Sequence, residues 1–289
     1  MRQNQSSLTA MGIALLRAVE TEKPAGEGIC HDTLARQFVP GWFYHLMKLF
    51  ISSGYAELRG HGIMGFILGR CRFIDDLLSD ELERGLQQLV ILGAGFDSRP
   101  YRFDLLGRGV KVFEVDHPAT QQAKVKRLEQ ILAPTGLPKN VTFVPVDFTR
   151  QSLAAGLADC GYDELARNLF IWEGVTEYLD LPAVDSTLAF VAHHSAPGSV
   201  IVFDYMYRGL LEGKAEGHSE VSSTRRYRGF SNEVLRFGIE EGQIEAFLSQ
   251  RGFSQASNAT APDLQARYFT GKNAGRKVAS GYAIAIGIV

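Results

Sequence analysis

Residues 88–99, QLVILGAGFDSR, join an apolar run to a turn with two glycines, and this stretch decides the fold of the chain. An apolar run of this length that ends in glycine is typical of a buried parallel strand. Gly93 and Gly95 would let the backbone of the turn approach a ligand that a Cβ atom would hold away. A single GxG after a strand also fits an ordinary strand-to-loop turn, so other residues must support a binding site.

A second apolar run, residues 110–116, follows this turn and ends in Asp116. Rossmann-type folds place a carboxylate about twenty residues after the glycine turn, where it accepts hydrogen bonds from ribose hydroxyls. A dinucleotide site would also have a third glycine three residues after Gly95, at the position of Ser98 in this chain. The pyrophosphate site is therefore poorly made, and we expect Asp116 to bind the ribose of another adenosine-containing cofactor.

The composition is that of an ordinary globular protein. With 289 residues and 45% hydrophobic content, the chain can bury one large core or a core with a helical cap. The formal net charge is −2, and its basic and acidic residues are interspersed, so no basic surface for a polynucleotide is predicted. No segment approaches the length of a membrane span. We therefore expect neither a nucleic-acid nor a membrane partner.

The cysteines are typical of a reducing compartment. Cys30, Cys71 and Cys160 are widely spaced and form no CxxC pair, so the sequence predicts neither a disulfide framework nor a zinc site. Residues 1–7, MRQNQSS, lack the apolar core of a secretory signal. We expect a cytoplasmic protein and predict no metal-site residues. The sequence indicates neither whether a metal is required nor the oligomeric state.

The alternation of strand and helix patterns predicts an α/β protein with a mostly parallel, doubly wound sheet. Residues 1–84 are expected to form a helical N-terminal cap, and residues 85–289 the core that contains the sheet. Residues 205–243 are expected to form an insertion that joins this cap over the acceptor. Beyond the first two strands, we expect strands at residues 141–147, 169–173, 199–204 and 282–289, and helices at residues 63–78 and after Pro118, Leu181 and Ile244.

Predicted strands end in acidic residues at Asp116, Asp147, Glu173 and Asp204. The ligand crevice of an open parallel sheet lies outside the carboxyl ends of its strands, so these acids should surround one pocket. Strand ends that meet water also tolerate acidic residues, but a series of them beside a glycine turn favours a site. S-adenosylmethionine suits this site, because carboxylates and carbonyls satisfy its ammonium, sulfonium, ribose hydroxyls and adenine amino group.

The carboxylate of this cofactor needs a cationic partner. Arg70 lies on the apolar stripe of the helix predicted at residues 63–78, where a guanidinium is costly to bury unless an anion satisfies it. Arg70 is therefore a candidate for the cofactor carboxylate, or for a structural ion pair with Asp75, Asp76 or another acid. Arg17 lies off the apolar stripe of its own helix, so the pattern alone places it in solvent.

Segments spread over nearly the whole chain resemble the leucine carboxyl methyltransferase family, and more closely its bacterial branch of S-adenosylmethionine-dependent O-methyltransferases. These segments are TAMGIALLRA from Thr9, GRCRFIDDLL from Gly69, VILGAGFDSRPYR from Val90, FEVDHPAT from Phe113, FVPVDF from Phe143, FIWEGVTEYL from Phe170 and LRFGIEEGQIEAFLSQRGF from Leu235. The resemblance implies the Rossmann-like fold of class I methyltransferases.

The resemblance also implies roles for individual residues. Those that would bind S-adenosylmethionine are Arg17 and Arg70 at the methionine carboxylate, Gly93 and Gly95 along the methionine portion, Asp116 at the ribose, and Asp147 with Phe148 at the adenine. Glu173 would lie close to the amino group of the cofactor or to the substrate, which makes it a candidate catalytic residue. Asp97 and Arg99 match the GxGxDxR turn of the family, and we expect them to shape the loop through a mutual ion pair.

Nothing in these motifs fixes the methyl acceptor. We expect O-methylation of a carboxylate or hydroxyl of a small molecule, with carboxyl methylation of a protein C-terminus as the alternative. Arg225, Arg226, Tyr227 and Arg228 could bind an acidic acceptor or form a solvated basic loop. An NAD-dependent oxidoreductase and a non-catalytic cofactor-binding protein are the alternatives from other functional classes.

Overall fold

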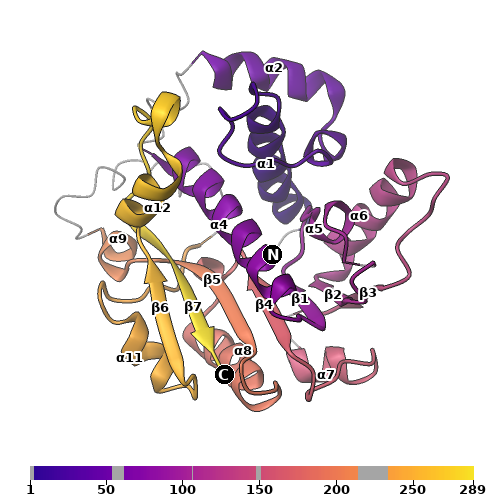
Figure 1. The fold of residues 1–289 in the computed structure, drawn as a ribbon, viewed down its shortest axis with the longest axis vertical. Helices are drawn as coiled ribbons and strands as arrows, with labels where there is room; N and C mark the ends of the chain where they lie inside the picture. Colours follow the sequence, from indigo (N-terminus) through magenta and orange to yellow (C-terminus); the bar gives the residue numbers. More distant parts are fainter. Residues whose placement is uncertain (1–2, 54–61, 106, 148–150, 214–233) are drawn as a thin grey trace.

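The computed structural model describes residues 3–53, 62–105, 107–147, 151–213 and 234–289 (Figure 1). A seven-stranded sheet in the order β3-β2-β1-β4-β5-β7-β6 forms its centre. The strands are β1 (Gln88–Leu92), β2 (Lys111–Asp116), β3 (Val141–Pro145), β4 (Asn168–Trp172), β5 (Val200–Met206), β6 (Gln255–Ala259) and β7 (Tyr282–Ile288). Strands β1 to β5 pair in parallel, and β7 is antiparallel to both of its neighbours. The predicted mostly parallel sheet is therefore confirmed.

All the predicted strands are present, but two details differ. The pairing of β5 with β7 extends to Met206, so Asp204 lies inside β5 rather than at its end. Residues 205 and 206 therefore belong to the sheet and not to an insertion, and residues 214–233 of the expected insertion lie outside the described residues. Strand β6 is absent from our prediction, because its sequence, QASNA, has no apolar run. It is an edge strand that pairs with β7, and this neighbour compensates for its weak intrinsic preference.

Helices cover both faces of the sheet, which explains why β1, β4 and β5 are buried along their whole length. One face packs against α7 (Leu153–Ala158), α8 (Leu181–His193) and α11 (Ile244–Ser249), and the other against α4 (Ile63–Glu83) and α12 (Ala261–Tyr268). Helix α6 (Pro118–Ile131) packs with the N-terminal helices, and α5 (Arg99–Arg102) and α9 (Arg208–Glu212) are short. Each helix that we predicted is present.

The N-terminal helices α1 (Gln3–Thr21) and α2 (Gly41–Ser52) lie above the carboxyl ends of β1 to β5 (Figure 1). The C-terminal segment helps to hold them there, because Arg276 Nη1 lies 2.7 Å from Glu20 Oε1 of α1. The Asn273 side chain also donates a hydrogen bond to the Glu27 carbonyl at 2.9 Å. These contacts join the segment that precedes β7 to α1 and to the loop that follows α1.

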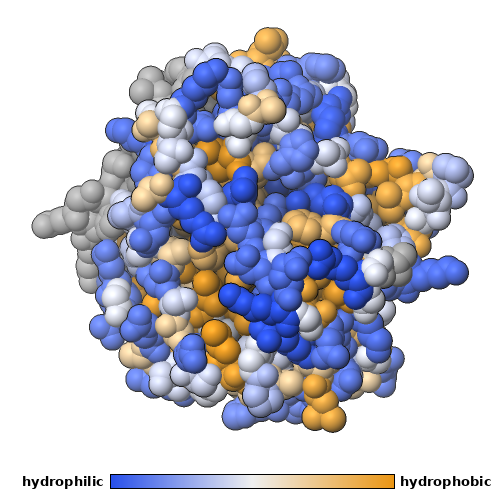
Figure 2. Space-filling model, in the orientation of Figure 1, coloured by the Kyte–Doolittle hydropathy of each residue, from blue (hydrophilic) through white to orange (hydrophobic). Residues whose placement is uncertain are grey.

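The surface in the same view is mostly hydrophilic, with separate apolar areas rather than one continuous band (Figure 2). Helix α2 exposes the side chains of Trp42, Leu46 and Leu49. Among the described residues, no helix combines the length and apolar character needed to cross a lipid bilayer.

Candidate active site

A cavity of about 120 Å³ lies at the carboxyl ends of β1, β2 and β4, beneath α1 and beside α4. Its lining includes six of the residues that we predicted to bind the cofactor: Arg17, Arg70, Gly93, Gly95, Asp116 and Glu173. Helix α1 contributes Thr9, Ala10 and Ile13, and Tyr178 follows β4. The structure therefore brings together residues that lie far apart in the sequence, at the crevice expected for an open parallel sheet.

The turn after β1 requires glycine at two positions, because of its backbone conformation and because other atoms lie close to it. Gly93 has φ of 68° and Gly95 has φ of 41°, in the left-handed region that glycine adopts without strain. A Cβ atom on Gly93 would lie 2.4 Å from Val175 Cγ2, and one on Gly95 would lie 3.4 Å from Ala10 Cβ. The turn thus approaches protein atoms closely as well as lining the cavity.

Asp116 is fixed at the end of β2 by backbone amides. Its Oδ2 atom accepts a hydrogen bond from Gly95 N–H and its Oδ1 atom one from His117 N–H, each at 2.6 Å. Burial raises the pKa of the Asp116 carboxyl, while the two amide donors oppose this shift. A carboxylate has about four lone-pair sites, so Asp116 can accept further hydrogen bonds from a ligand in the cavity.

Arg17 is buried, with 7% of its surface exposed, and our pattern-based placement of it in solvent is wrong. Its Nε atom donates to Asp32 Oδ2 at 2.9 Å, and Nη2 donates to the Phe96 carbonyl at 2.6 Å. These partners come from segments after α1 and after the glycine turn. The helical pattern of α1 contains no information about them, which is why the pattern alone failed.

Arg70 is also buried, with 4% of its surface exposed. Its Nε atom donates to Glu173 Oε1 at 3.0 Å, and its Nη1 atom pairs with the carboxylate of Asp204. The acids that satisfy Arg70 are therefore these two, rather than Asp75 or Asp76. The Nη2 atom is buried and has no hydrogen-bond partner within the described part of the chain. This nitrogen is a free donor of a cavity-lining guanidinium.

Glu173 is held between two arginines. Its Oε1 atom also accepts from Cys71 Sγ at 3.2 Å, and its Oε2 atom accepts from Arg99 Nη1 at 2.8 Å. Burial by itself would raise the pKa of Glu173, but the charges of Arg99 and Arg70 hold it well below its usual range. Glu173 is therefore an ionised carboxylate at neutral pH, and a carboxylate with so low a pKa is a weak base.

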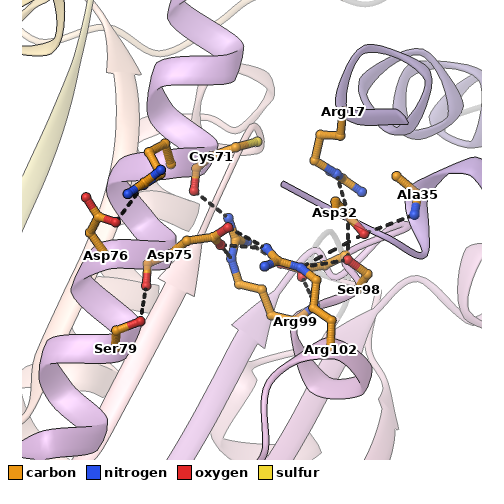
Figure 3. Close-up of polar contacts among 12 residues, drawn as sticks. Arg17, Asp32, Ala35, Cys71, Asp75, Asp76, Ser79, Ser98, Arg99 and Arg102 are labelled. Atoms are coloured by element: carbon orange, nitrogen blue, oxygen red, sulfur yellow. Dashed lines mark hydrogen bonds and ion pairs between the residues drawn. The ribbon is translucent and has the colours of Figure 1, made fainter. Parts of the chain in front are cut away.

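Asp97 and Arg99 form the ion pair that we expected, with Arg99 Nη1 at 2.5 Å from Asp97 Oδ2. The sequence did not reveal that this ion pair belongs to a larger network of charged residues. Arg99 also binds Asp75 of α4 at 2.7 Å, and Arg102 donates to both oxygens of Asp75 (Figure 3). The sequence signal for this contact between α5 and α4 was the spacing of Arg99 and Arg102, which lie one helical turn apart and therefore on the same face of a helix.

The sequence profile of the leucine carboxyl methyltransferase family matches residues 10–192. This span is more than half of the 289 residues. The chain belongs to the leucine carboxyl methyltransferase family. The resemblance that we inferred from short segments is therefore confirmed, and the methyltransferase class with it.

Bacterial relatives agree with this family assignment. YktD of Bacillus subtilis (strain 168) is 32% identical over 205 residues, which cover 71% of this chain and 66% of that protein. RHA1_ro00605 of Rhodococcus jostii (strain RHA1) is 34% identical over 265 residues, which cover 90% of this chain and 86% of that protein. Both are named as inferred S-adenosyl-L-methionine-dependent methyltransferases.

A solved structure described as a possible exported protein from Bordetella parapertussis has the same fold, with a TM-score of 0.52 and 13% sequence identity. The similarity covers 100% of this chain and 97% of that one. This similarity shows the fold alone. The sheet order and the family match together confirm the predicted Rossmann-like α/β fold in this member of the leucine carboxyl methyltransferase family.

The structure does not place the other predicted site residues in the cavity lining. Asp147 follows β3, and its N–H donates to Gln151 Oε1 at 3.0 Å, but the described lining of the cavity does not include it. Phe148 lies outside the described residues, as do Arg225, Arg226, Tyr227 and Arg228. Their proposed contacts with adenine and with an acidic acceptor remain predictions.

Proposed function

We propose that this protein transfers the methyl group of S-adenosylmethionine to a carboxylate or hydroxyl oxygen of a small molecule. Membership of a methyltransferase family and the names of its bacterial relatives support the reaction class and the methyl donor. The observation that carries the proposal is the free donor of Arg70, because a buried guanidinium nitrogen that lines a cavity needs an anionic partner. The carboxylate of S-adenosylmethionine is such a partner.

The residues of the cavity suit this cofactor. A Cβ atom on Gly174 would lie 3.4 Å from Arg70 Nη2, so the glycine keeps space open beside the free donor. Arg70 and Arg17 would hold the cofactor carboxylate, Asp116 the ribose hydroxyls and Glu173 the ammonium group. Asp147 and Phe148 would meet the adenine. When bound, the cofactor supplies a methyl group that its sulfonium already activates for displacement.

The protein's own task is then to align the acceptor oxygen with the methyl group and to exclude water. The described lining of the cavity contains no histidine, lysine or cysteine that could act as a base. Among the acids of the lining, Asp97 is paired with Arg99, and the low pKa of Glu173 makes it a poor proton acceptor. Asp116 accepts hydrogen bonds from two backbone amides and would be occupied by the ribose hydroxyls. A carboxylate acceptor is already ionised at neutral pH and needs no base, so the lining favours it over a hydroxyl.

The dinucleotide alternative has little support in this cavity. The position of the third glycine is occupied by Ser98, which is buried. Its Oγ atom donates to Asp32 Oδ2 at 2.6 Å and accepts from Arg102 Nε at 3.1 Å. A backbone approach to a pyrophosphate at this position would have to displace these polar contacts.

Two measurements test the proposal. Calorimetry should detect binding of S-adenosylmethionine and of S-adenosylhomocysteine to the purified protein. Incubation with a methyl-labelled donor and a panel of carboxylates, alcohols, phenols and C-terminal peptides should then yield an O-methylated product. Absence of binding to both nucleosides would refute the proposal, as would transfer to nitrogen or carbon alone. Binding without turnover on any acceptor would favour the non-catalytic alternative, and labelling of peptides alone would favour a protein substrate.

A further inference from the structure

Arg99 is buried behind the cavity without lining it, with 2% of its surface exposed. Its guanidinium nevertheless contacts three acidic side chains: Asp75 at 2.7 Å, Asp97 at 2.5 Å and Glu173 at 2.8 Å. Figure 3 shows the Arg99 side chain directed from α5 toward α4. Asp75 and the Cys71 carbonyl hold the guanidinium from α4, and Asp97 holds it from the glycine turn. Its contact with Glu173 joins it to a second residue that lines the cavity.

We propose that Arg99 is a positioning residue that holds Glu173 as an oriented carboxylate for the ammonium group of the methyl donor. This inference rests on the proposed function, and it goes beyond the loop-shaping role that the Asp97 pair suggests. Arg99 acts through Glu173, since it does not itself reach the cavity lining.

The division of labour between the two arginines supports this role. Arg70 contacts Glu173 through Nε and Asp204 through Nη1, so its third nitrogen is left for a ligand. Arg99 supplies the second charged partner of Glu173 at Oε2. Without Arg99, Glu173 would keep Arg70 as its only ion-pair partner within the described residues, with the charge of Arg17 as further compensation.

The surroundings of Glu173 determine what removal of Arg99 would do. The charged groups near it are Arg70 of α4, Arg99 of α5, Arg17 of α1, and the carboxylates of Asp97 and Asp204. The pKa of the nearby Cys71 thiol is raised by burial, so this thiol is a neutral donor. Burial alone favours the protonated form of Glu173, and the arginines oppose it. Loss of Arg99 should therefore raise the pKa of Glu173 above its wild-type value and make its charge more sensitive to low pH.

The test is calorimetric titration with S-adenosylmethionine between pH 5.5 and pH 8.5, using intact protein. In the wild type, Glu173 should stay ionised over this range, so its titration should cause little change in affinity. Arg99→Met should bind with an affinity that falls by about tenfold as the pH decreases, because a protonated Glu173 no longer attracts the ammonium group. Adding Glu173→Gln to Arg99→Met should abolish this pH dependence, since the titrating group is gone.

Arg102→Met is the matched control. Arg102 is partly buried, with its side chain 11% exposed, and it also binds Asp75, but within the described part of the chain it makes no ion pair with Glu173. A purely structural role for Arg99 would make the two variants alike, so a wild-type pH profile in Arg99→Met, or the same altered profile in both variants, would overturn the inference. Should Arg99→Met not fold, Arg99→Lys keeps a charge without the planar fork and should show a weaker pH dependence of the same sign. A wild-type pH dependence of affinity in folded Arg99→Lys would then contradict the positioning role of Arg99.

Failure of the inference can be distinguished from failure of the proposed function. If the wild type binds neither S-adenosylmethionine nor S-adenosylhomocysteine, the proposed function is wrong and the role of Arg99 falls with it. If the wild type binds and the Arg99 variants keep its pH profile, the proposed function stands and only the positioning role is wrong.

Discussion

Arg70 of α4 donates a hydrogen bond to Glu173, which follows β4, across a sequence separation of 103 residues. The same guanidinium pairs with Asp204 inside β5, and its buried Nη2 atom beside the cavity has no hydrogen-bond partner among the described residues. Helix α4 is thereby joined to the carboxyl ends of the central strands at the point where a cofactor would bind. This contact makes α4 part of the site.

Arg70→Lys should weaken binding of S-adenosylmethionine by about tenfold, because a lysine keeps the charge but cannot serve both carboxylates and a ligand at once. Calorimetry at fixed pH would measure the change. The matched control is Arg72→Lys on the same helix, where the exposed Arg72 pairs with Asp76. Equal affinities for the wild type and Arg70→Lys would contradict the assignment of the cofactor carboxylate to Arg70.

Asp116→Asn should also weaken cofactor binding by about tenfold, since the amide loses one acceptor and the negative charge that favours ribose hydroxyls. The new amide would in addition place its NH₂ group against either Gly95 N–H or His117 N–H, which now donate to the carboxylate. Calorimetry should show a smaller effect for analogues of the methionine portion that lack the nucleoside. A loss of affinity that is equal for such analogues would place Asp116 away from the ribose.

Lys124→Met should destabilise the fold by about 3 to 5 kcal/mol, because it leaves a buried carboxylate without its cation. Lys124 Nζ lies 2.8 Å from Glu114 Oε2, and both side chains are 1% exposed. Burial raises the pKa of Glu114, and loss of the ammonium should raise it further. A group whose pKa is raised on folding stabilises the fold below its unfolded pKa and loses this contribution as the pH rises.

Urea unfolding of Lys124→Met at pH 5 and pH 8 would measure this effect. The deficit relative to the wild type should be smaller at pH 5, where Glu114 can be neutral. The double variant Lys124→Met with Glu114→Gln should recover part of the lost stability at pH 8. An equal deficit at both pH values would show that lost packing, rather than the unpaired carboxylate, causes the destabilisation.

Gly93→Ala should lower stability by about 1 to 3 kcal/mol and also impair cofactor binding, because the new Cβ would clash with Val175 and distort the turn. Urea unfolding and calorimetry would measure the two effects. Gly109→Ala is the control, since Gly109 has φ of 72° but no atom within 4 Å of its added Cβ. The control should lose only the stability that backbone strain costs, about 1 kcal/mol, and its cofactor binding should be unchanged. Equal effects of the two substitutions would show that the close approach at Gly93 is unimportant.

The sequence by itself determined the parallel sheet, the glycine turn and the acidic residues Asp116 and Glu173 at the carboxyl ends of β2 and β4. These features depend on local patterns: apolar runs produce buried strands, and glycine permits the left-handed turn. The family was also readable from contiguous segments. Strand β6 was not, because its polar sequence forms a strand only beside β7.

Only the tertiary structure decided the partners of the arginines. Helical periodicity places Arg17 in solvent, whereas Asp32 and the Phe96 carbonyl bury it. The same limit applies to Arg99, whose contact with Glu173 joins positions 74 residues apart. A charged side chain is stable inside a protein only when its counter-charges are close in space, and these come from distant segments that a local pattern does not encode.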